Sequence, residues 1–202
     1  GAIVMGETDA LPLLKIFTIG ILVHIYGFAF NHYNDIEVDR LTHKLKARPL
    51  VSGIIKKRNA LIYILGILIL AFLLTLSYFD IVVVMIFLLG IILATLYDVF
   101  SKKISGMDLI LGASVVVGAI FGSATVSTSF TKQAYMLWIL AFIQTLNLNL
   151  IAGGLKDADH DWLSGSKHLS TRLGVKVENG RFIVPKSFKV IAFFLGVLYA
   201  FF

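Results

Sequence analysis

Six long apolar runs constrain the fold of this chain more than any other feature of its sequence. They lie at about residues 12–34, 59–77, 81–98, 108–127, 134–156 and 190–202. A helix needs about 20 mostly apolar residues to cross the roughly 30 Å hydrocarbon core of a bilayer. The first five runs come close to that length, and the last barely qualifies. The sequence therefore predicts an all-α bundle with about six membrane-spanning helices.

The composition argues strongly against a water-soluble globular fold. Hydrophobic residues make up 58% of the 202 residues and charged residues only 15%, whereas soluble domains average about 45–50% and about 25%. So few charges cannot cover a protein of this size, and most of its surface must therefore face lipid. The chain has no cysteine, which excludes disulfides, thiolate metal sites and thiol nucleophiles.

We expect residues 1–202 to form a single transmembrane domain that is incomplete at both ends. Residues 1–6 resemble the end of another membrane helix, and the last apolar run stops at Phe202 without a polar flank. Polar and aromatic residues normally anchor the ends of a membrane helix at the interface. An intact protein is therefore expected to have at least one further helix before residue 1 and a completed helix at its end.

The basic residues predict how the bundle is oriented. Alternation of the spans places loops at about 40–58, 99–107 and 157–189 on one side of the membrane. All but two of the 18 Lys and Arg residues lie in or next to these loops, the exceptions being Lys15 and Lys132. By the positive-inside rule, this side is cytoplasmic. All but three of the 12 acidic residues lie there too, and the rule does not explain them.

A first polar cluster lies at the end of the first predicted span. Asn31, Asp35 and Asp39 are spaced four residues apart, which places them on one face of a helix. Carboxylate oxygens at this spacing suit Mg²⁺, which keeps several waters and shares its other positions with substrate phosphates. The alternative is a solvated acidic helix end. It is weakened because the helix dipole disfavours acids at a C-terminus by about 0.3–1 kcal/mol each.

A second cluster of the same design lies near the end of the fifth span. Asn149, Gly153, Asp157 and Asp161 follow one another at intervals of four, so an amide again precedes two carboxylates on one helical face. One such cluster is weak evidence for a metal site. Two clusters on the same side of the membrane predict a pair of Mg²⁺ sites.

Fixed positive charge lies in the short loop between the clusters, at Lys102 and Lys103. Two divalent cations with nearby lysines fit a diphosphate, which such groups neutralise and position. The lysines could equally be snorkelling or topology-setting charges. A cation-coupled transporter is the competing class, and it predicts charges near the bilayer midplane and broken helices in matching halves. A non-catalytic lipid-binding protein is a further alternative, and it requires no divalent cation.

These motifs resemble the UbiA superfamily of intramembrane prenyltransferases over about residues 6–200. The signature N-x-x-x-D-x-x-x-D corresponds to Asn31, Asp35 and Asp39, and the R-P-x-x-x-G that follows it begins at Arg48. The second signature, D-x-x-x-D, corresponds to Asp157 and Asp161. Further matches are the Tyr and basic pair of the middle loop, with a lysine after the second signature: Tyr97, Lys102, Lys103 and Lys167. Family members have about nine transmembrane helices, of which this chain resembles the second to the seventh.

The resemblance implies a Mg²⁺-dependent transfer of a prenyl group from an isoprenyl diphosphate to a hydrophobic acceptor. Ionisation of the allylic diphosphate would precede attack by an aromatic quinone precursor or a lipid-like acceptor. Two Mg²⁺ ions would be held by the catalytic Asp35, Asp39, Asp157 and Asp161, with Asn31 beside them. The implied diphosphate ligands are Arg48, Lys102, Lys103 and Tyr97, and the implied supporting residues are Asn149 and Lys167. No nucleic-acid partner is expected, and motifs common to the whole family do not select the acceptor or the donor length.

Overall fold

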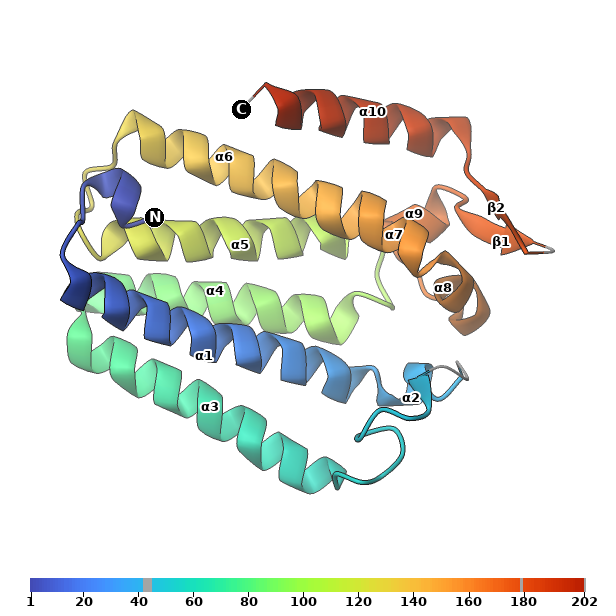
Figure 1. The fold of residues 1–202 in the computed structure, drawn as a ribbon, viewed down its shortest axis with the longest axis horizontal. Helices are drawn as coiled ribbons and strands as arrows, with labels where there is room; N and C mark the ends of the chain where they lie inside the picture. Colours follow the sequence, from blue (N-terminus) through green and yellow to red (C-terminus); the bar gives the residue numbers. More distant parts are fainter. Residues whose placement is uncertain (42–44, 179, 202) are drawn as a thin grey trace.

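The long helices of the chain run side by side (Figure 1). The computed structural model describes residues 1–41, 45–178 and 180–201, without the side chains of residues 160 and 163. Residues 42–44 of the predicted loop 40–58 thus lie outside the described part. The long helices are α1 (Ala10–Asn34), α3 (Lys57–Tyr78), α4 (Ile81–Phe100), α5 (Met107–Ala124), α6 (Lys132–Leu146) and α10 (Lys186–Ala200).

Most short elements gather at one end of this bundle (Figure 1). The 3₁₀ turn η1 (Ile3–Met5) lies at the other end, and the π-helix η3 (Asn147–Gly153) continues α6. The gathered elements are α2 (Ile36–Asp39), α7 (Gly154–Lys156), α8 (Ala158–Ser164), α9 (Leu169–Arg172), β1 (Lys176–Glu178) and β2 (Arg181–Ile183). The three loops that sequence alternation placed on one side of the membrane therefore do share one end of the bundle.

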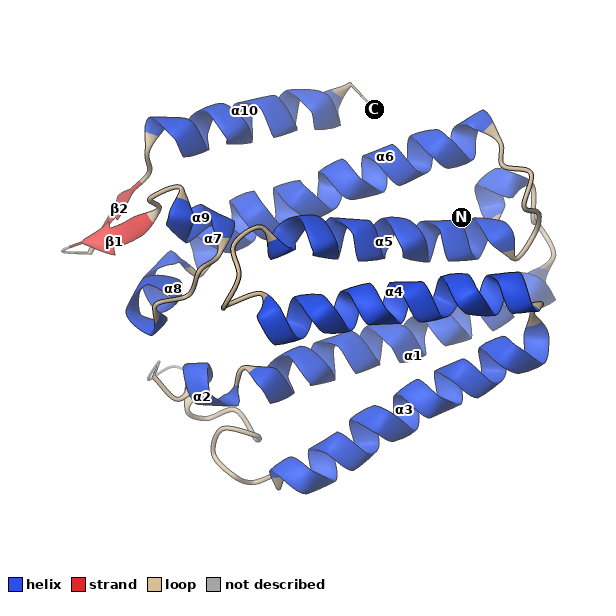
Figure 2. Cartoon of the chain, turned by 180° about the vertical axis from the view of Figure 1, so that it is seen from behind, coloured by secondary structure: helices blue, strands red, loops and turns tan. Residues whose placement is uncertain are grey.

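Five helical segments of the described chain are long and apolar enough to cross a membrane. They are α1, α3, α4, α5 and the continuous segment Lys132–Lys156, which confirms five of the predicted spans. The sixth is a helix, but it begins at Lys186 and has 15 residues. At about 1.5 Å per residue it is shorter than the hydrocarbon core of a bilayer. It lies next to α6 (Figure 2).

Apolar side chains fill the space between the first four long helices. Ile19 and Tyr26 of α1 pack with Ile64 of α3 and with Val83 and Phe87 of α4 in one buried cluster. This packing holds α1 against both α3 and α4, so the end of α1 is fixed relative to the loop that follows α4. The first acidic cluster is thereby placed opposite that loop.

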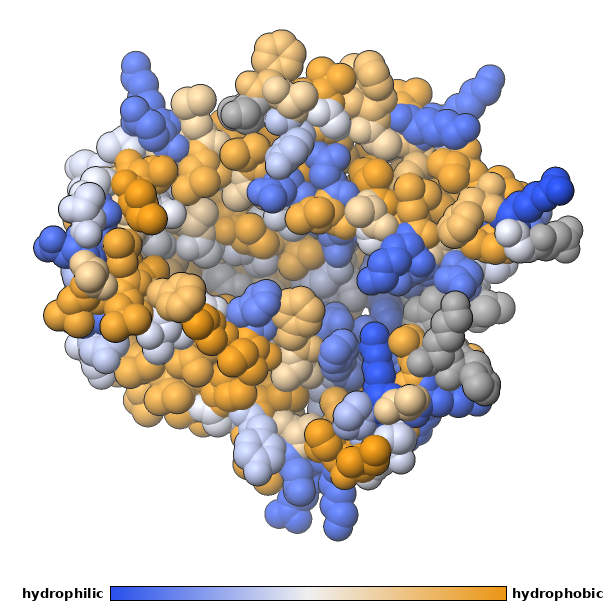
Figure 3. Space-filling view, viewed as in Figure 1, coloured by the Kyte–Doolittle hydropathy of each residue, from blue (hydrophilic) through white to orange (hydrophobic). Residues whose placement is uncertain are grey.

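The outer faces of the same helices remain apolar. Large side chains such as Phe17 of α1, Ile62 of α3 and Ile92 of α4 are more than half exposed. Figure 3 shows apolar residues covering much of the visible face of the helices, with hydrophilic residues protruding at several places along its rim. An apolar exterior of this extent is stable only in contact with lipid.

A short β-hairpin interrupts the otherwise helical fold and was not predicted. β1 and β2 are antiparallel, with Val177 opposite Phe182. The sequence Asn179-Gly180 is typical of a two-residue hairpin turn, and Gly180 has a positive φ of 73°. The all-α class holds for the membrane-spanning part, and the hairpin belongs to the loop predicted at 157–189.

Candidate active site

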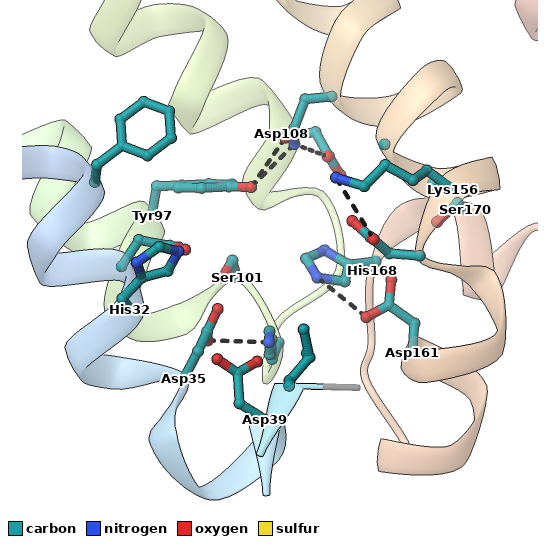
Figure 4. A pocket seen from close by; sticks show the side chains of 18 of the residues that line it. His32, Asp35, Asp39, Tyr97, Ser101, Asp108, Lys156, Asp161, His168 and Ser170 are labelled. Atoms are coloured by element: carbon teal, nitrogen blue, oxygen red, sulfur yellow. Dashed lines mark hydrogen bonds and ion pairs between the residues drawn. The ribbon is translucent and has the colours of Figure 1, made fainter. Parts of the chain in front are cut away.

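A cavity of about 380 Å³ lies at the end of the bundle where the short elements gather. Its walls come from α1, α2, α4, α5, η3, α7, α8 and α9, so segments far apart in the sequence meet there (Figure 4). Both predicted clusters line it: Asn31, Asp35, Asp39, Asn149, Gly153, Asp157 and Asp161. Arg48, Tyr97 and Lys102 line it as well. The cavity lies at helix ends rather than at the middle of the bundle, unlike the site expected of a transporter.

The first wall is formed where α1 passes into α2. Asp35 is the residue between the two helices, with φ −85° and ψ −2°, and its carbonyl accepts a hydrogen bond from the Asp39 amide at 2.8 Å. This four-residue bond keeps helical spacing across the junction. Asn31, Asp35 and Asp39 therefore do share one side of the structure. Asp39 is buried, with 3% of its surface exposed.

The second wall repeats this construction. Asp157 separates α7 from α8, with φ −101° and ψ 8°, and its carbonyl accepts a hydrogen bond from the Asp161 amide at 2.8 Å. The preceding turns are π-helical, which changes the angle between successive residues. The stretch from Asn149 to Asp161 is therefore not one continuous α-helix. Asn149, Gly153, Asp157 and Asp161 nevertheless all line the cavity.

Each of the four predicted metal-binding carboxylates has a basic partner. Arg48 lies 2.6 Å from Asp39, and Lys102 lies 3.0 Å from Asp35. On the second wall, Lys156 lies 3.8 Å from Asp157 and His168 lies 3.8 Å from Asp161. Arg48, Lys102 and Lys156 thus offset part of the negative charge of the cavity, and each of these contacts can be exchanged for a contact with a bound cation.

A second group of polar side chains lies on the side of the cavity away from Asp35 and Asp39 (Figure 4). The Asn149 amide nitrogen lies 3.0 Å from the Tyr97 hydroxyl and 2.7 Å from Oδ1 of Asp108. Asn31 donates a hydrogen bond to Asp98 at 3.2 Å. Asn149 therefore joins the fifth span to α4 and α5.

Sequence reasoning missed several residues of this cavity. Asp108 and Asp98 were counted only as acids on one side of the membrane, although each is a carboxylate inside or next to a long apolar run, which is a signal of function. His168 and Lys156 gave no signal, because their positions follow from how α7 and α9 meet. The remaining unpredicted polar residues of the lining are His32, Ser101 and Ser170.

Two predicted residues are not among those that line the cavity. Lys103 is exposed, and its ammonium lies 6.0 Å from the centre of the Phe100 ring. Lys167 is also exposed, and its backbone amide donates to the Lys102 carbonyl at 2.9 Å. Lys167 thus supports the loop that positions Lys102, through its main chain.

The cavity supplies oxygen ligands of the kind that Mg²⁺ prefers. Among the described residues, no three Asp, Glu, His or Cys side chains come together in a group that could hold a metal ion. A divalent cation here would therefore complete its coordination with water or with oxygens of a bound ligand, as Mg²⁺ commonly does with phosphates. The donor set fits Mg²⁺ on that condition.

An apolar groove of about 360 Å³ adjoins the cavity. It runs between α1, α3 and the segment after Arg48, and its apolar lining includes Ala29, Val51, Ile64 and Ile67. His32, Asp39 and Arg48 line both spaces. A polar cavity that opens into an apolar groove suits a ligand with an anionic head and a hydrocarbon tail.

The fold and the cavity together define an integral, multi-pass membrane protein with a polar site at one end of its helical bundle. Residues 2–202 match the UbiA prenyltransferase family. The chain belongs to that family, which confirms the resemblance of its motifs.

Curated relatives include the 4-hydroxybenzoate octaprenyltransferase of Francisella tularensis subsp. tularensis (strain SCHU S4 / Schu 4). It is 26% identical over 168 residues, which cover 83% of this chain and 58% of that protein. The enzyme of the same name from Blochmanniella pennsylvanica (strain BPEN) is 24% identical over 193 residues, which cover 96% and 65%. The chain thus spans less than two thirds of the length of these relatives.

Solved structures share the fold. A UbiA homologue from Archaeoglobus fulgidus, bound to GPP and Mg²⁺, matches 99% of this chain and 69% of its own at a TM-score of 0.77 and 17% identity. The apo UbiA homologue from Aeropyrum pernix K1 matches 98% and 71% at a TM-score of 0.76 and 17% identity. A digeranylgeranylglyceryl phosphate synthase matches 98% and 65% at a TM-score of 0.63 and 26% identity.

Proposed function

We propose that the full-length protein transfers a prenyl group from an isoprenyl diphosphate to a hydrophobic acceptor, with the active site on the cytoplasmic face of the membrane. The observation that carries this proposal is the convergence of two Asp pairs, Asp35 with Asp39 and Asp157 with Asp161, on one cavity that also holds Arg48 and Lys102. The adjoining apolar groove favours an amphipathic substrate over a small ion. The curated relatives and a solved homologue carry names that agree with this chemistry.

Different residues of the cavity would have different roles in binding a diphosphate. The carboxylates of the cavity would repel a diphosphate unless cations lay between them. Arg48 and Lys102 are paired with two of these carboxylates, so they cannot neutralise a diphosphate alone. Asp35 and Asp39 would hold one Mg²⁺, with Asn31 beside them, and Asp157 and Asp161 would hold a second. When bound, Mg²⁺ would neutralise the diphosphate and make it a better leaving group.

The ion pairs of the cavity indicate how Arg48 and Lys102 take part. Both now contact the carboxylates that would hold the cations, at 2.6 Å and 3.0 Å. With donor present, the guanidinium of Arg48 and the ammonium of Lys102 can turn to phosphate oxygens, for which both groups form strong charge-assisted hydrogen bonds. The same two side chains thus stabilise the empty cavity and then the diphosphate.

The remaining parts of the site follow from its shape. The donor's hydrocarbon tail would leave the cavity past His32 into the groove between α1 and α3. Tyr97 and Asn149 would form the wall near the allylic carbon. The acceptor is an aromatic quinone precursor or a lipid-like molecule, as the names of the curated and structural relatives suggest.

The experiment that tests this function uses the full-length protein in lipid nanodiscs. Geranyl diphosphate with radiolabel in the prenyl group is supplied with Mg²⁺ and either 4-hydroxybenzoate or geranylgeranylglyceryl phosphate. We expect a labelled product that EDTA abolishes, and loss of at least about 100-fold in rate for Asp39→Asn and Asp161→Asn. Asp80→Asn is the matched control, because Asp80 caps α4 at the other end of the bundle and accepts backbone hydrogen bonds there that Asn can also accept. Near-normal transfer by either site variant would contradict the two-metal assignment.

A further inference from the structure

Asp108 differs from every other carboxylate that lines the cavity. It is buried, with 3% of its surface exposed. Asp35, Asp39, Asp157 and Asp161 each face a Lys, Arg or His side chain. In the part of the chain that the structure describes, Asp108 has no ion pair, and the hydrogen bond of its side chain is with the amide of Asn149, at 2.7 Å. A carboxylate in a membrane protein is rarely placed at such a position without a function.

A purely structural role does not explain this side chain. Asp108 is the second residue of α5, where a negative charge interacts favourably with the helix dipole. The residue before α5 is Gly106, which has no side chain to cap the helix. The Asp108 carboxylate contacts Asn149 from η3, on another span. The side chain is thus oriented toward the cavity wall rather than toward its own helix.

Asn149 and Tyr97 fix the orientation of Asp108. The Asn149 amide nitrogen lies within hydrogen-bond distance of both the Tyr97 hydroxyl and Oδ1 of Asp108. One amide hydrogen of Asn149 is therefore committed to Oδ1 of Asp108, while the Tyr97 hydroxyl lies 3.0 Å from the amide nitrogen and 3.2 Å from the amide oxygen. Because Asp108 lines the cavity, its second oxygen is available to a ligand as a hydrogen-bond acceptor.

The position of Asp108 relative to the charged groups matches the geometry of an allylic substitution. Figure 4 shows Asp108 and Tyr97 on one side of the cavity and Asp35, Asp39 and Asp161 on the opposite side. After ionisation, a diphosphate that stays bound covers one face of the planar allylic cation, so the acceptor attacks the opposite face. A diphosphate held among Asp35, Asp39 and Asp161 therefore directs the attacking acceptor toward Asp108, while the tail leaves sideways into the groove.

We infer that Asp108 binds a hydroxyl group of the acceptor and takes its proton during transfer, an inference that rests on the proposed prenyl transfer. The allylic C–O bond breaks and its electron pair leaves with the diphosphate. A new bond forms between the allylic carbon and the acceptor, either at the hydroxyl oxygen or at a ring carbon next to a phenolic hydroxyl. The hydroxyl proton passes to the Asp108 carboxylate, which becomes a carboxylic acid. After attack by oxygen, Asp108 later returns this proton to water. After attack by a ring carbon, the product is a dienone, which loses the ring proton to water while its oxygen regains a proton, and the aromatic hydroxyl is restored. The substrate class is thus a hydroxyl-bearing acceptor, either a phenol or a glycerol ether.

The test separates donor chemistry from acceptor chemistry in the full-length protein in nanodiscs. Asp108→Asn keeps the shape of the side chain and an oxygen for Asn149, but it is a very weak proton acceptor. For this variant we expect transfer to 4-hydroxybenzoate or geranylgeranylglyceryl phosphate to fall at least about 100-fold, in the range of general-base contributions. Mg²⁺-dependent binding of geranyl thiolodiphosphate, and the slow acceptor-free hydrolysis of geranyl diphosphate, should change by less than about twofold. Asp80→Asn is again the matched control.

The results distinguish the possibilities. A transfer rate of Asp108→Asn within about tenfold of the wild-type rate would overturn the proposed role of Asp108. Loss of both donor binding and transfer would also overturn it, because Asp108 would then belong to the donor site or be needed for folding. If the wild-type protein binds donor but prenylates neither hydroxyl probe, the hydroxyl acceptor is wrong, whereas absence of donor binding refutes the proposed function itself. If Asp108→Asn does not fold, a competition experiment with the wild-type protein tests the inference instead. 4-Hydroxybenzoate should displace bound, labelled acceptor at least about tenfold better than 4-methoxybenzoate, which lacks the free hydroxyl group. Equal displacement would overturn the inference. Whichever probe accepts label identifies the phenol or the glycerol ether.

Discussion

The ammonium of Lys102 lies 3.0 Å from Oδ1 of Asp35, and both side chains are largely buried. This contact joins the loop after α4 to the end of α1. The neighbouring Lys103 is exposed and lies outside the cavity lining. The structure thus separates two adjacent lysines that the sequence motif treats as a pair.

This separation predicts different effects for the two lysines. Lys102→Met leaves Asp35 without its cation and removes one charge from the diphosphate site, so the KM for geranyl diphosphate should rise by about 10–100-fold, equivalent to about 1.4–2.7 kcal/mol. Lys103→Met should change KM by less than about threefold. Steady-state kinetics in nanodiscs measure both. Equal effects of the two substitutions would show that Lys103 enters the cavity when donor binds.

The contact between Arg48 and Asp39 predicts that cation and donor bind together rather than independently. Without donor, Arg48 competes with a divalent cation for the Asp39 carboxylate. We expect Mg²⁺ alone and thiolodiphosphate alone to raise the Tm only slightly, and the two together to raise it by several degrees, because ligands that bind only the folded protein stabilise it. EDTA should reverse the combined effect.

Arg48→Met tests the same ion pair by changing the affinities for cation and for donor in opposite directions. Removal of the guanidinium leaves Asp39 more available to cations but removes a ligand of the diphosphate. Mn²⁺ alone, followed by electron paramagnetic resonance, should then bind more tightly than to the wild type, while thiolodiphosphate should bind more weakly in the presence of Mg²⁺. If both affinities fall, the ion pair supports the fold of the cavity and is not exchanged.

Much of the fold could be predicted because the bilayer imposes simple rules on sequence. A span must be apolar over nearly its whole length, so five helices and their alternation followed from the apolar runs. α10 was harder to predict because its 15 residues are flanked by a hairpin whose two short strands contain only six residues. Such short elements depend on local turn chemistry more than on apolar periodicity.

The candidate site was predictable only where candidate metal-binding side chains recur at helical spacing along one segment. Asn31, Asp35 and Asp39 keep helical spacing across the end of α1, and hence the pattern was sufficient. The π-helix before Asp157 has no comparable sequence pattern, and its effect is to turn Asn149 toward Asp108 and Tyr97. The position of Asp108 next to an apolar run marks it as a candidate, but its contact with Asn149 could not be predicted, because the two residues are distant in sequence.

The groove between α1 and α3 predicts a dependence on donor length. Val51 lines it from the segment after Arg48 rather than from a helix core, so Val51→Trp should fill the groove without disturbing the bundle. The KM for farnesyl and geranylgeranyl diphosphates should rise by about tenfold, the effect expected for several displaced methylene groups. Dimethylallyl diphosphate, whose tail is too short to reach the groove, should be unaffected. A uniform effect on all donors would place the tail elsewhere.

The tight contact between α7 and α9 predicts a stability effect that a second substitution corrects. A Cβ added at Gly154 would lie 2.5 Å from Cβ and 2.8 Å from Oγ of Ser170, and Ser170 is buried. Gly154→Ala should therefore destabilise the protein by about 1–3 kcal/mol, as overpacked sites do, and should also reduce transfer because both residues line the cavity.

Gly154→Ala combined with Ser170→Gly removes the clash. The double variant should regain much of the lost Tm, and the double-mutant cycle should give a favourable coupling energy of about 0.5–3 kcal/mol. Gly20→Ala is the matched control, because a Cβ at this helical position meets no atom within 4 Å, and it should leave the Tm unchanged or slightly raised. Additive losses from Gly154→Ala and Ser170→Gly would mean that α9 does not pack on α7 as described.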